Sequence, residues 1–227
     1  MAQILVIGAH PDDAEIGMGG TILKLGAQGH TVTLLDLTNG EPTPMGTPEQ
    51  RAKEAQEAAL VLGVERRITL PLPNRYVMDT VENRKMVAEV IREVRPDYLF
   101  IHYWEDAHPD HVAACRLCEA ARFYGKLTKT DMRGEPFYPR KVFHFEAIHY
   151  RLYLKPSFIM DISDQIGRKL EAIACYRSQF NEARGTAALL QTIKDINRYW
   201  GALIRRTHGE PFVCREEIGL AGLDALV

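Results

Sequence analysis

The sequence predicts an α/β fold, a Rossmann-like three-layer α/β/α arrangement with a mostly parallel central sheet. Two observations support this prediction. Short apolar segments alternate with longer segments of helical periodicity, and the first apolar segment is continuous, as in a strand that helices cover on both faces. Right-handed crossovers between such units give parallel sheets. The length of 227 residues and the hydrophobic content of 46% suit a single domain over residues 1–227.

The elements expected in the first half alternate regularly. Strands are predicted over residues 3–8, 31–37, 67–70 and 97–102, because each range is short and apolar. Helices are predicted over residues 21–28, 48–62, 81–94 and 112–124. The second of these helices has Pro48 in its first turn and Gly63 after its end, and Pro96 stops the third. This half of the chain therefore predicts four β-α units.

The second half is less regular. The segment "LTKTDMRGEPFYPR", residues 127–140, is turn-rich and charged, and we interpret it as a surface excursion rather than a linker between domains. Further strands are expected over residues 142–145 and 157–161, and further helices over residues 164–176 and 187–205. No internal repeat or low-complexity tract interrupts this pattern.

Composition excludes several classes of function. The formal net charge of -2 gives no electrostatic reason to expect nucleic acid or an anionic membrane as a partner. No apolar run approaches the ~20 residues that span a bilayer, and the chain starts with a strand rather than a secretion signal, so we expect a cytoplasmic protein. The four cysteines, Cys115, Cys118, Cys175 and Cys214, are expected to be free thiols.

The first strand leads directly into an acidic stretch, "IGAHPDDAEIGMGG". Within six residues this stretch contains His10, Asp12, Asp13 and Glu15. Burying an unpaired charge costs several kcal/mol unless a partner or a metal compensates it. We therefore expect a positive ion or group close to these side chains.

A second stretch of the same character, "HYWEDAHPDH", also follows an apolar strand. It supplies His102, Glu105, Asp106, His108, Asp110 and His111. Loops that follow different strands of a parallel sheet meet at one edge, so the two stretches can converge on one ion. Two imidazoles and one carboxylate are sufficient for zinc, and they suit zinc better than magnesium, while iron in a similar triad stays open.

The remaining acidic side chains suit hydrolysis. A metal-activated water needs a nearby base, and a leaving group needs an acid. Asp12 and Asp13 are adjacent, so one can face the metal and the other the water. His108 can stabilise an oxyanion or donate a proton, with Asp110 orienting its ring.

The stretches "AHPDDAEIGMGGT" and "HPDH" resemble the zinc-dependent N-acetylglucosaminyl deacetylases of the LmbE or PIG-L family, and the resemblance covers nearly the whole chain. "PSFIMDISDQIGRKLEAIACYRSQF" and "RYWGALIRRTHGEPF" further resemble the branch that deacetylates N-acetylglucosaminyl malate in bacillithiol synthesis. The chain departs from that branch at two places. Ala107 stands where the branch often has an arginine, and the segment "TNGEPTPMGT" differs from the sequence most common there.

The resemblance implies a role for individual residues. The zinc ligands would be His10, Asp13 and His111, with Asp12 as the general base. His108 would assist at the oxyanion or the leaving amine, with Asp110 behind it. Three further residues would contact the sugar or line its pocket, namely Arg51, Arg198 and Tyr199.

Two other interpretations come from different classes of protein. A non-catalytic zinc could fasten the loops, although such an ion needs neither Asp12 nor His108. Gly17, Gly19 and Gly20 invite a dinucleotide-binding interpretation, but no G-x-G-x-x-G motif is present and the stretch is acidic. We expect these glycines to let the backbone pass close to metal and substrate before the helix begins.

The sequence thus predicts a hydrolase that removes the N-acetyl group of a small-molecule N-acetylglucosaminide and releases acetate. The resemblance favours N-acetylglucosaminyl malate, and a chitin disaccharide is the alternative substrate. Zn²⁺ is the expected cofactor, with Fe²⁺ as the alternative. The resemblance also implies a homo-oligomer, in many relatives a hexamer.

Overall fold

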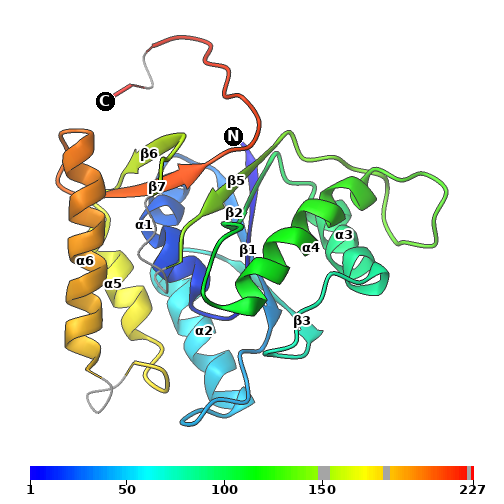
Figure 1. Cartoon of the computed structure of the whole chain (residues 1–227), viewed down its shortest axis with the longest axis horizontal. Coiled ribbons are helices and arrows are strands. Elements are labelled where there is room, and N and C mark those ends of the chain that lie inside the picture. Colours follow the sequence, from blue (N-terminus) through cyan, green and yellow to red (C-terminus); the bar gives the residue numbers. More distant parts are fainter. Residues whose placement is uncertain (148–153, 181–184, 224–225) are drawn as a thin grey trace.

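A seven-stranded sheet forms the centre of the molecule (Figure 1). The computed structural model describes residues 1–147, 154–180, 185–223 and 226–227. The strands stand in the order β3-β2-β1-β4-β5-β7-β6. Their bounds are β1 Gln3–Gly8, β2 Thr31–Thr38, β3 Arg66–Leu72, β4 Tyr98–His102, β5 Lys141–Phe145, β6 Phe158–Asp161 and β7 Gly209–Val213. The first five strands pair in parallel, and β7 pairs antiparallel with both β5 and β6.

Helices cover both faces of this sheet. Their bounds are α1 Asp13–Ala27, α2 Pro48–Leu62, α3 Val81–Val94, α4 Pro109–Gly125, α5 Ile166–Ala174 and α6 Thr186–Leu203. α3 and α4 pack on one face, while α1, α2 and α5 pack on the other, and α6 packs against β7 and α5. The predicted three-layer α/β/α class, with a mostly parallel sheet, is confirmed.

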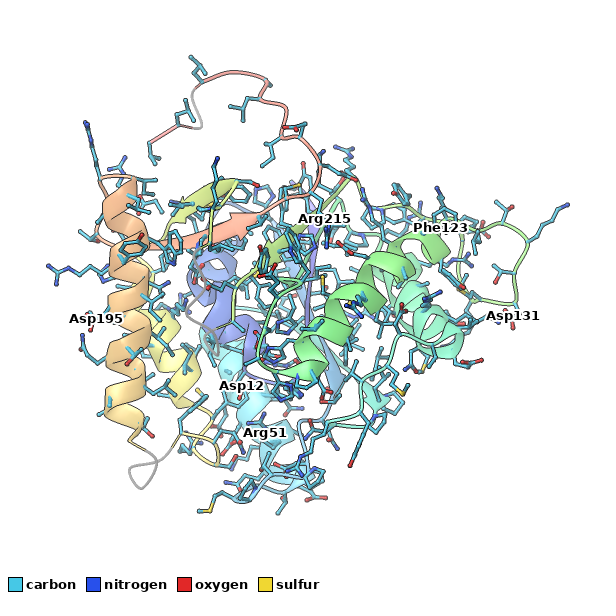
Figure 2. The ribbon with its side chains drawn as sticks, in the orientation of Figure 1. Asp12, Arg51, Phe123, Asp131, Asp195 and Arg215 are labelled. Carbon is cyan, nitrogen blue, oxygen red and sulfur yellow. The ribbon has the colours of Figure 1, made fainter. Side chains whose placement is uncertain are left out.

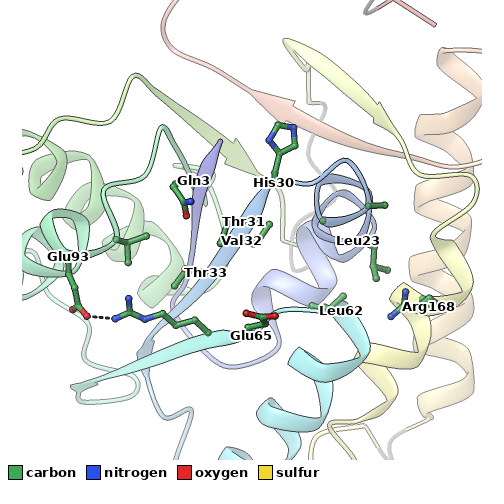
Figure 3. A pocket seen from close by; sticks show the side chains of 15 residues that line it. Gln3, Leu23, His30, Thr31, Val32, Thr33, Leu62, Glu65, Glu93 and Arg168 are labelled. Carbon is green, nitrogen blue, oxygen red and sulfur yellow. Dashed lines mark hydrogen bonds and ion pairs between the residues drawn. The ribbon is translucent and has the colours of Figure 1, made fainter. Parts of the chain in front are cut away.

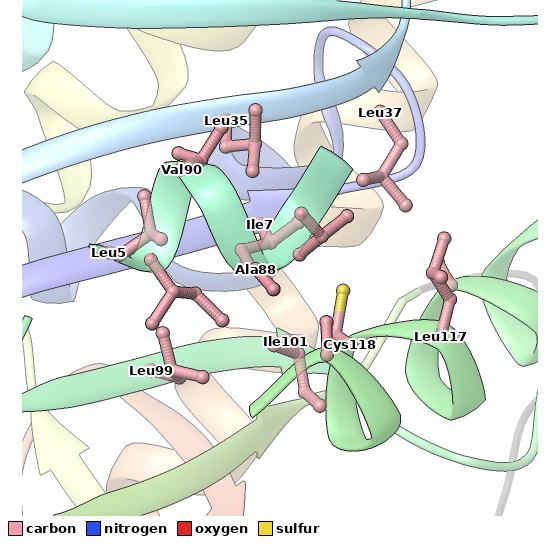
Figure 4. Packing of buried hydrophobic residues seen from close by; sticks show 14 of the residues in the cluster. Leu5, Ile7, Leu35, Leu37, Ala88, Val90, Leu99, Ile101, Leu117 and Cys118 are labelled. Carbon is pink, nitrogen blue, oxygen red and sulfur yellow. The ribbon is translucent and has the colours of Figure 1, made fainter. Parts of the chain in front are cut away.

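Alternation along β1 divides the core into two halves. Leu5 and Ile7 point toward α3 and α4, where they pack with residues such as Leu99 and Cys118 (Figure 4). Ile4 and Val6 point the other way, into a second cluster under α1 and α2. Successive side chains of a strand face opposite sides of the sheet, so the continuous apolar run of β1 serves both layers. The strand is consequently fixed in place, and with it the residues that follow.

Most predicted elements are present with ends shifted by a few residues. α2 begins at Pro48, and the Thr47 side chain accepts a hydrogen bond from the Gln50 N–H, as in an N-terminal cap. The expected surface excursion over residues 127–140 contains no helix or strand. β7 was not predicted, since Gly209 and Pro211 are poor strand formers and its partner strands are distant in sequence.

The start of α1 corrects a prediction. The helix was expected over residues 21–28, after a glycine-rich loop, yet it begins at Asp13 and includes the glycines, with a kink at Met18. A Cβ at Gly17 would clash with the Phe145 ring, and one at Gly20 would lie 2.7 Å from Ile162. The glycines therefore let α1 pack closely on neighbouring elements, and this packing overrides their low helix propensity.

The cysteines behave as the sequence predicts. All four are free, and Cys115 and Cys118 are buried in α4. Within the described ranges, no helix is both long enough and apolar enough to cross a membrane.

Candidate metal centre

The two acidic stretches meet at the carboxyl ends of neighbouring strands. β1 ends at Gly8, shortly before His10, and β4 ends at His102, from which a loop leads to α4. β1 and β4 pair directly in parallel, so both chain segments leave the same edge of the sheet. His108 is the N-cap of α4, and His111 lies in its first turn.

His10, Asp13 and His111 form a buried cluster at this edge. Asp13 Oδ2 lies 3.5 Å from His10 Nδ1, and Asp13 Oδ1 lies 3.2 Å from His111 Nε2. One potential ligand atom from each residue lies within 4.8 Å of the others, and all three residues are buried. Two imidazoles and a carboxylate are a donor set that suits zinc. The three residues predicted as ligands are thus brought together, and they fit a metal ion.

The Asp110 side chain contacts a different histidine from the one that the sequence predicts. It was expected to orient the His108 ring, but its Oδ2 lies 3.1 Å from His10 Nε2, and it is the Asp110 backbone N–H that donates to His108 Nδ1, at 3.2 Å. The cause is the N-cap position of His108, which turns its Nδ1 toward the first amides of α4. His10, His108 and Asp110 also lie close enough to form a second potential ligand group.

Two further side chains orient the cluster, and sequence reasoning gave them no role. Asp106 Oδ2 lies 3.0 Å from His111 Nδ1, on the side of the ring away from Asp13. His102 Nε2 lies 3.0 Å from Asp13 Oδ2, and the His102 ring stacks on that of His111 with centroids 4.1 Å apart. Such outer contacts fix the rings of metal-binding histidines. The available signal was their place within the second acidic stretch.

Asp12 turns away from Asp13 toward α2. Its φ of 116° puts the backbone in the left-handed region, which is strained for a residue with a side chain. Asp12 Oδ2 lies 3.4 Å from Arg51 Nη1, and Arg51 Nη2 donates to the Pro11 carbonyl at 2.6 Å. Figure 2 shows Asp12 and Arg51 side by side. The two adjacent aspartates therefore face different partners.

The electrostatics of the cluster follow from this packing. Burial opposes the charge on His10, but the Asp110 and Asp13 carboxylates outweigh it and raise the pKa of His10 to about 9. Burial likewise opposes the charge on His111, while Asp13 and Asp106 raise its pKa to about 10. Burial raises the pKa of Asp12 to about 7, with Arg51 opposing this shift and Asp13 adding to it. These values describe the cluster without an ion.

Glu15 connects the acidic stretch to side chains of other elements through hydrogen bonds. Its Oε1 accepts hydrogen bonds from Arg67 Nη1 at 2.6 Å and from the Tyr176 hydroxyl at 2.9 Å. Arg67 also binds both oxygens of Asp36, at 2.6 and 2.8 Å. The Tyr176 ring lies under the Arg51 guanidinium, 5.3 Å from centroid to Cζ. A buried charge network thus ties α1 to β2, β3 and the chain after α5.

A cavity of about 320 Å³ opens beside the cluster. His10, Asp12, Asp13, His108 and His111 line its floor, and Arg51 belongs to its wall. Its other walls come from the loops after β2 and β3 and from Gln179 and Phe180. The cavity is within the size range of small-ligand sites.

Arg198 and Tyr199, which the resemblance implies for the sugar pocket, lie away from this cavity in the described structure, and their role stays a prediction. α6 packs through a face that contains Ile193, Asn197 and Trp200, and this orientation turns Arg198 and Tyr199 outward. Tyr199 is 57% exposed, and Arg198 lies in a separate surface hollow with other residues of α6. Neither residue is among those that line the cavity beside the metal cluster.

Two other features lie apart from this centre. A hollow of about 640 Å³ at the amino ends of β1 and β2 is lined by residues such as His30, Leu62 and Arg168 (Figure 3). Cys115, Glu119 and His144 also come close enough to hold an ion, but Arg215 Nε donates to Glu119 at 2.7 Å and already supplies a positive charge.

Comparisons with known proteins agree on one relationship. A profile of the family described as GlcNAc-PI de-N-acetylase, PIG-L, matches residues 5–122. The diacetylchitobiose deacetylase of Thermococcus kodakarensis is 34% identical over 196 residues, which are 79% of this chain and 71% of that protein. A probable N-acetyl-alpha-D-glucosaminyl L-malate deacetylase 2 of Bacillus cereus is 28% identical, over 78% of this chain and 83% of its own.

A solved structure matches nearly the whole chain. The conserved protein TT1542 from Thermus thermophilus superposes with a TM-score of 0.90 and 37% sequence identity. The match covers 97% of this chain and 98% of that one. The topology described above is therefore also that of an experimentally determined protein.

Proposed function

Because the chain belongs to the PIG-L family of GlcNAc-PI de-N-acetylases, we propose that it is a metal-dependent hydrolase that removes the N-acetyl group from a GlcNAc-containing small molecule. The reaction would consume water and release acetate and a free amine. The observation that carries this proposal is the juxtaposition of a metal-binding cluster with Asp12 at the floor of one cavity. A metal that only fastened loops would need neither the cavity nor Asp12.

His10, Asp13 and His111 are the proposed ligands, and Zn²⁺ is the proposed ion. The buried cluster of two imidazoles and one carboxylate supports zinc, and Fe²⁺ is the alternative that the same triad accepts. When bound, such an ion acidifies a water molecule and polarises the amide carbonyl.

Asp12 is the proposed general base. Its carboxylate lies beside the ligands but faces Arg51, so it is available to accept the proton of the attacking water. Burial raises the pKa of Asp12 to about 7 in the metal-free protein, and a cation bound beside it would lower that pKa, so the carboxylate would be ionised and able to accept a proton near pH 7. As the C–N bond breaks, the proton held on Asp12 would pass to the departing amine nitrogen.

His108 is proposed as the hydrogen-bond donor to the developing oxyanion. Burial together with the nearby charge of His111 lowers the pKa of His108 to about 4, so the ring is neutral near pH 7. Its Nδ1 accepts the Asp110 N–H, so the proton of the neutral ring is on Nε2. A neutral donor suits oxyanion stabilisation, and it leaves protonation of the amine to Asp12.

For the substrate, we propose N-acetylglucosaminyl malate first and diacetylchitobiose second. The first rests on the resemblance of residues 156–180 and 198–212 to the malate deacetylases and on the related Bacillus cereus protein. The second rests on the higher identity to the Thermococcus kodakarensis enzyme.

Acetate release across a panel of glycosides tests the proposal. The panel contains N-acetylglucosaminyl malate, diacetylchitobiose and methyl N-acetylglucosaminide, and metal content is measured on the same samples. We expect acetate release that a chelator abolishes and that added Zn²⁺ restores, with the fold retained throughout. If the chelator unfolds the protein and no glycoside yields acetate at any metal loading, the ion is structural and the proposal is wrong.

A further inference from the structure

Arg75 is a cation at the cavity that the proposed chemistry does not use. Among the residues that line the cavity, the arginines are Arg51 and Arg75, and no lysine is present. Arg51 is buried and is committed to Asp12 and to the Pro11 carbonyl. Arg75 is exposed, on the loop after β3. The two arginines therefore occupy different environments in one cavity.

The backbone of Arg75 is held in a strained conformation. Its φ is 70°, in the left-handed region, which is unfavourable for a residue with a side chain. The Arg75 N–H donates to Asp110 Oδ2 at 2.7 Å, and the Val77 N–H donates to Asp110 Oδ1 at 3.2 Å. The same Asp110 carboxylate contacts His10. The position of Arg75 is thus tied to the metal cluster through one carboxylate.

The guanidinium of Arg75 has no acidic partner among the residues that the structure describes. Its one hydrogen bond there is from Nη2 to the Pro42 carbonyl, at 2.8 Å. The cavity carboxylates of Asp12 and Asp13 face Arg51 and the histidines instead. An arginine fork with open donors binds carboxylates through two parallel hydrogen bonds.

We propose that Arg75 binds a carboxylate on the aglycone of the substrate and so selects anionic glucosaminides over neutral ones. The inference rests on the proposed function, because it requires the acetamide to be held at the metal cluster. The metal cluster and Arg75 line the same cavity, so one bound glycoside can contact both.

The test compares two glycosides of the same sugar. Values of kcat and KM are measured for N-acetylglucosaminyl malate and for uncharged methyl N-acetylglucosaminide with wild type, Arg75→Gln and Arg75→Lys. For Arg75→Gln, we expect the ratio of kcat/KM for malate over methyl glycoside to fall roughly tenfold to hundredfold, mainly through KM. Arg75→Lys, which retains the charge but not the fork, should recover part of that ratio.

Arg205→Gln is the matched control. Arg205 also has a left-handed φ, of 57°, and is exposed, but it does not line the cavity, so its replacement should leave the ratio unchanged. If wild type deacetylates both glycosides and Arg75→Gln leaves the ratio unchanged, the role of Arg75 is refuted while the deacetylase activity stands. If wild type deacetylates only diacetylchitobiose, the role of Arg75 is refuted while the deacetylase activity stands, and if it releases acetate from none of the three glycosides, both proposals fail.

Discussion

At the scale of single residues, each imidazole of the metal cluster contacts a carboxylate through the ring nitrogen that faces away from Asp13. Asp110 contacts His10 Nε2, and Asp106 contacts His111 Nδ1, while Asp13 lies between the two rings. The ligands were predictable because both acidic stretches follow strands of one parallel sheet and match motifs of the family that the sequence resembles. The partners were not, because the geometry of the α4 N-terminus decides which carboxylate faces which ring.

Replacing Asp106 tests this arrangement. We predict that Asp106→Asn weakens zinc binding roughly tenfold to hundredfold, because the His111 ring loses its charged partner. Zinc dissociation constants, measured by competition with a chelating dye, check the prediction. Glu105→Gln, an exposed neighbour, is the control and should bind zinc as wild type does. An unchanged affinity in Asp106→Asn would show that His111 is oriented without Asp106.

The same residues predict how metal binding depends on pH. With raised pKa values of about 9 and about 10, His10 and His111 are both protonated at pH 7 in the absence of an ion. Their ion pairs stabilise the metal-free protein at pH values below the ordinary histidine pKa, and this contribution disappears as pH rises through 9 and 10. A metal needs neutral imidazoles, so its binding must displace these protons.

We therefore predict that zinc binding at pH 7 releases about two protons and that apparent affinity rises from pH 6 to pH 9. Calorimetry in buffers of different ionisation enthalpy measures the protons, with buffers that do not bind zinc. His208→Gln is a suitable control, because His208 does not line the cavity. Binding without proton release, and equally tight at both pH values, would contradict the assigned ligands.

At the scale of elements, α1 shows where sequence reasoning succeeds and where it cannot. The strands β1 to β6 and the helices α2 and α3 follow from local patterns, such as Pro48 in the first turn of α2 and Pro96 after the end of α3. The early start of α1 does not, since glycines favour a loop until Phe145 and Ile162, distant in sequence, pack against them. β7 was missed for the same reason, and the outward turn of Arg198 depends on which face α6 buries.

A pair of glycine substitutions in α1 isolates this packing. A Cβ at Gly20 would lie 2.7 to 2.9 Å from three atoms of Ile162, whereas nothing lies within 4 Å of one at Gly26. We predict that Gly20→Ala lowers the free energy of unfolding by about 1–3 kcal/mol. Gly26→Ala, the matched control, should raise it by about 0.5–1 kcal/mol. Urea unfolding measures the free energy of unfolding of both variants. Equal changes in the two variants would show that packing against Ile162 does not explain the glycine at position 20.

At the scale of the whole molecule, the segment after β7 bears on assembly. Figure 1 shows this segment running out beyond the sheet, and Ile218, Leu220, Leu223 and Leu226 in it are all exposed. Exposed apolar side chains that lie close together mark interaction surfaces. The homo-oligomer that the family resemblance implies stays a prediction, and these exposed side chains are the place where we test it.

We predict that replacing Leu220, Leu223 and Leu226 together with serine lowers the molar mass in solution, because the contact between copies loses apolar area. Light scattering after gel filtration measures this mass. Leu60→Ser is the control, since Leu60 is exposed on α2, outside this segment. A molar mass that is the same in the triple variant and in wild type would show that the segment does not hold an oligomer together.

Asp12→Asn tests the claim that the ion is catalytic and that Asp12 acts on the water beside it. Metal content and acetate release are measured together, with His10→Ala and the exposed Asp195→Asn for comparison. We predict that Asp12→Asn keeps the metal and loses roughly 10²–10⁴ in kcat, that His10→Ala loses the metal, and that Asp195→Asn matches wild type. Near wild-type turnover by metal-loaded Asp12→Asn would contradict the claim.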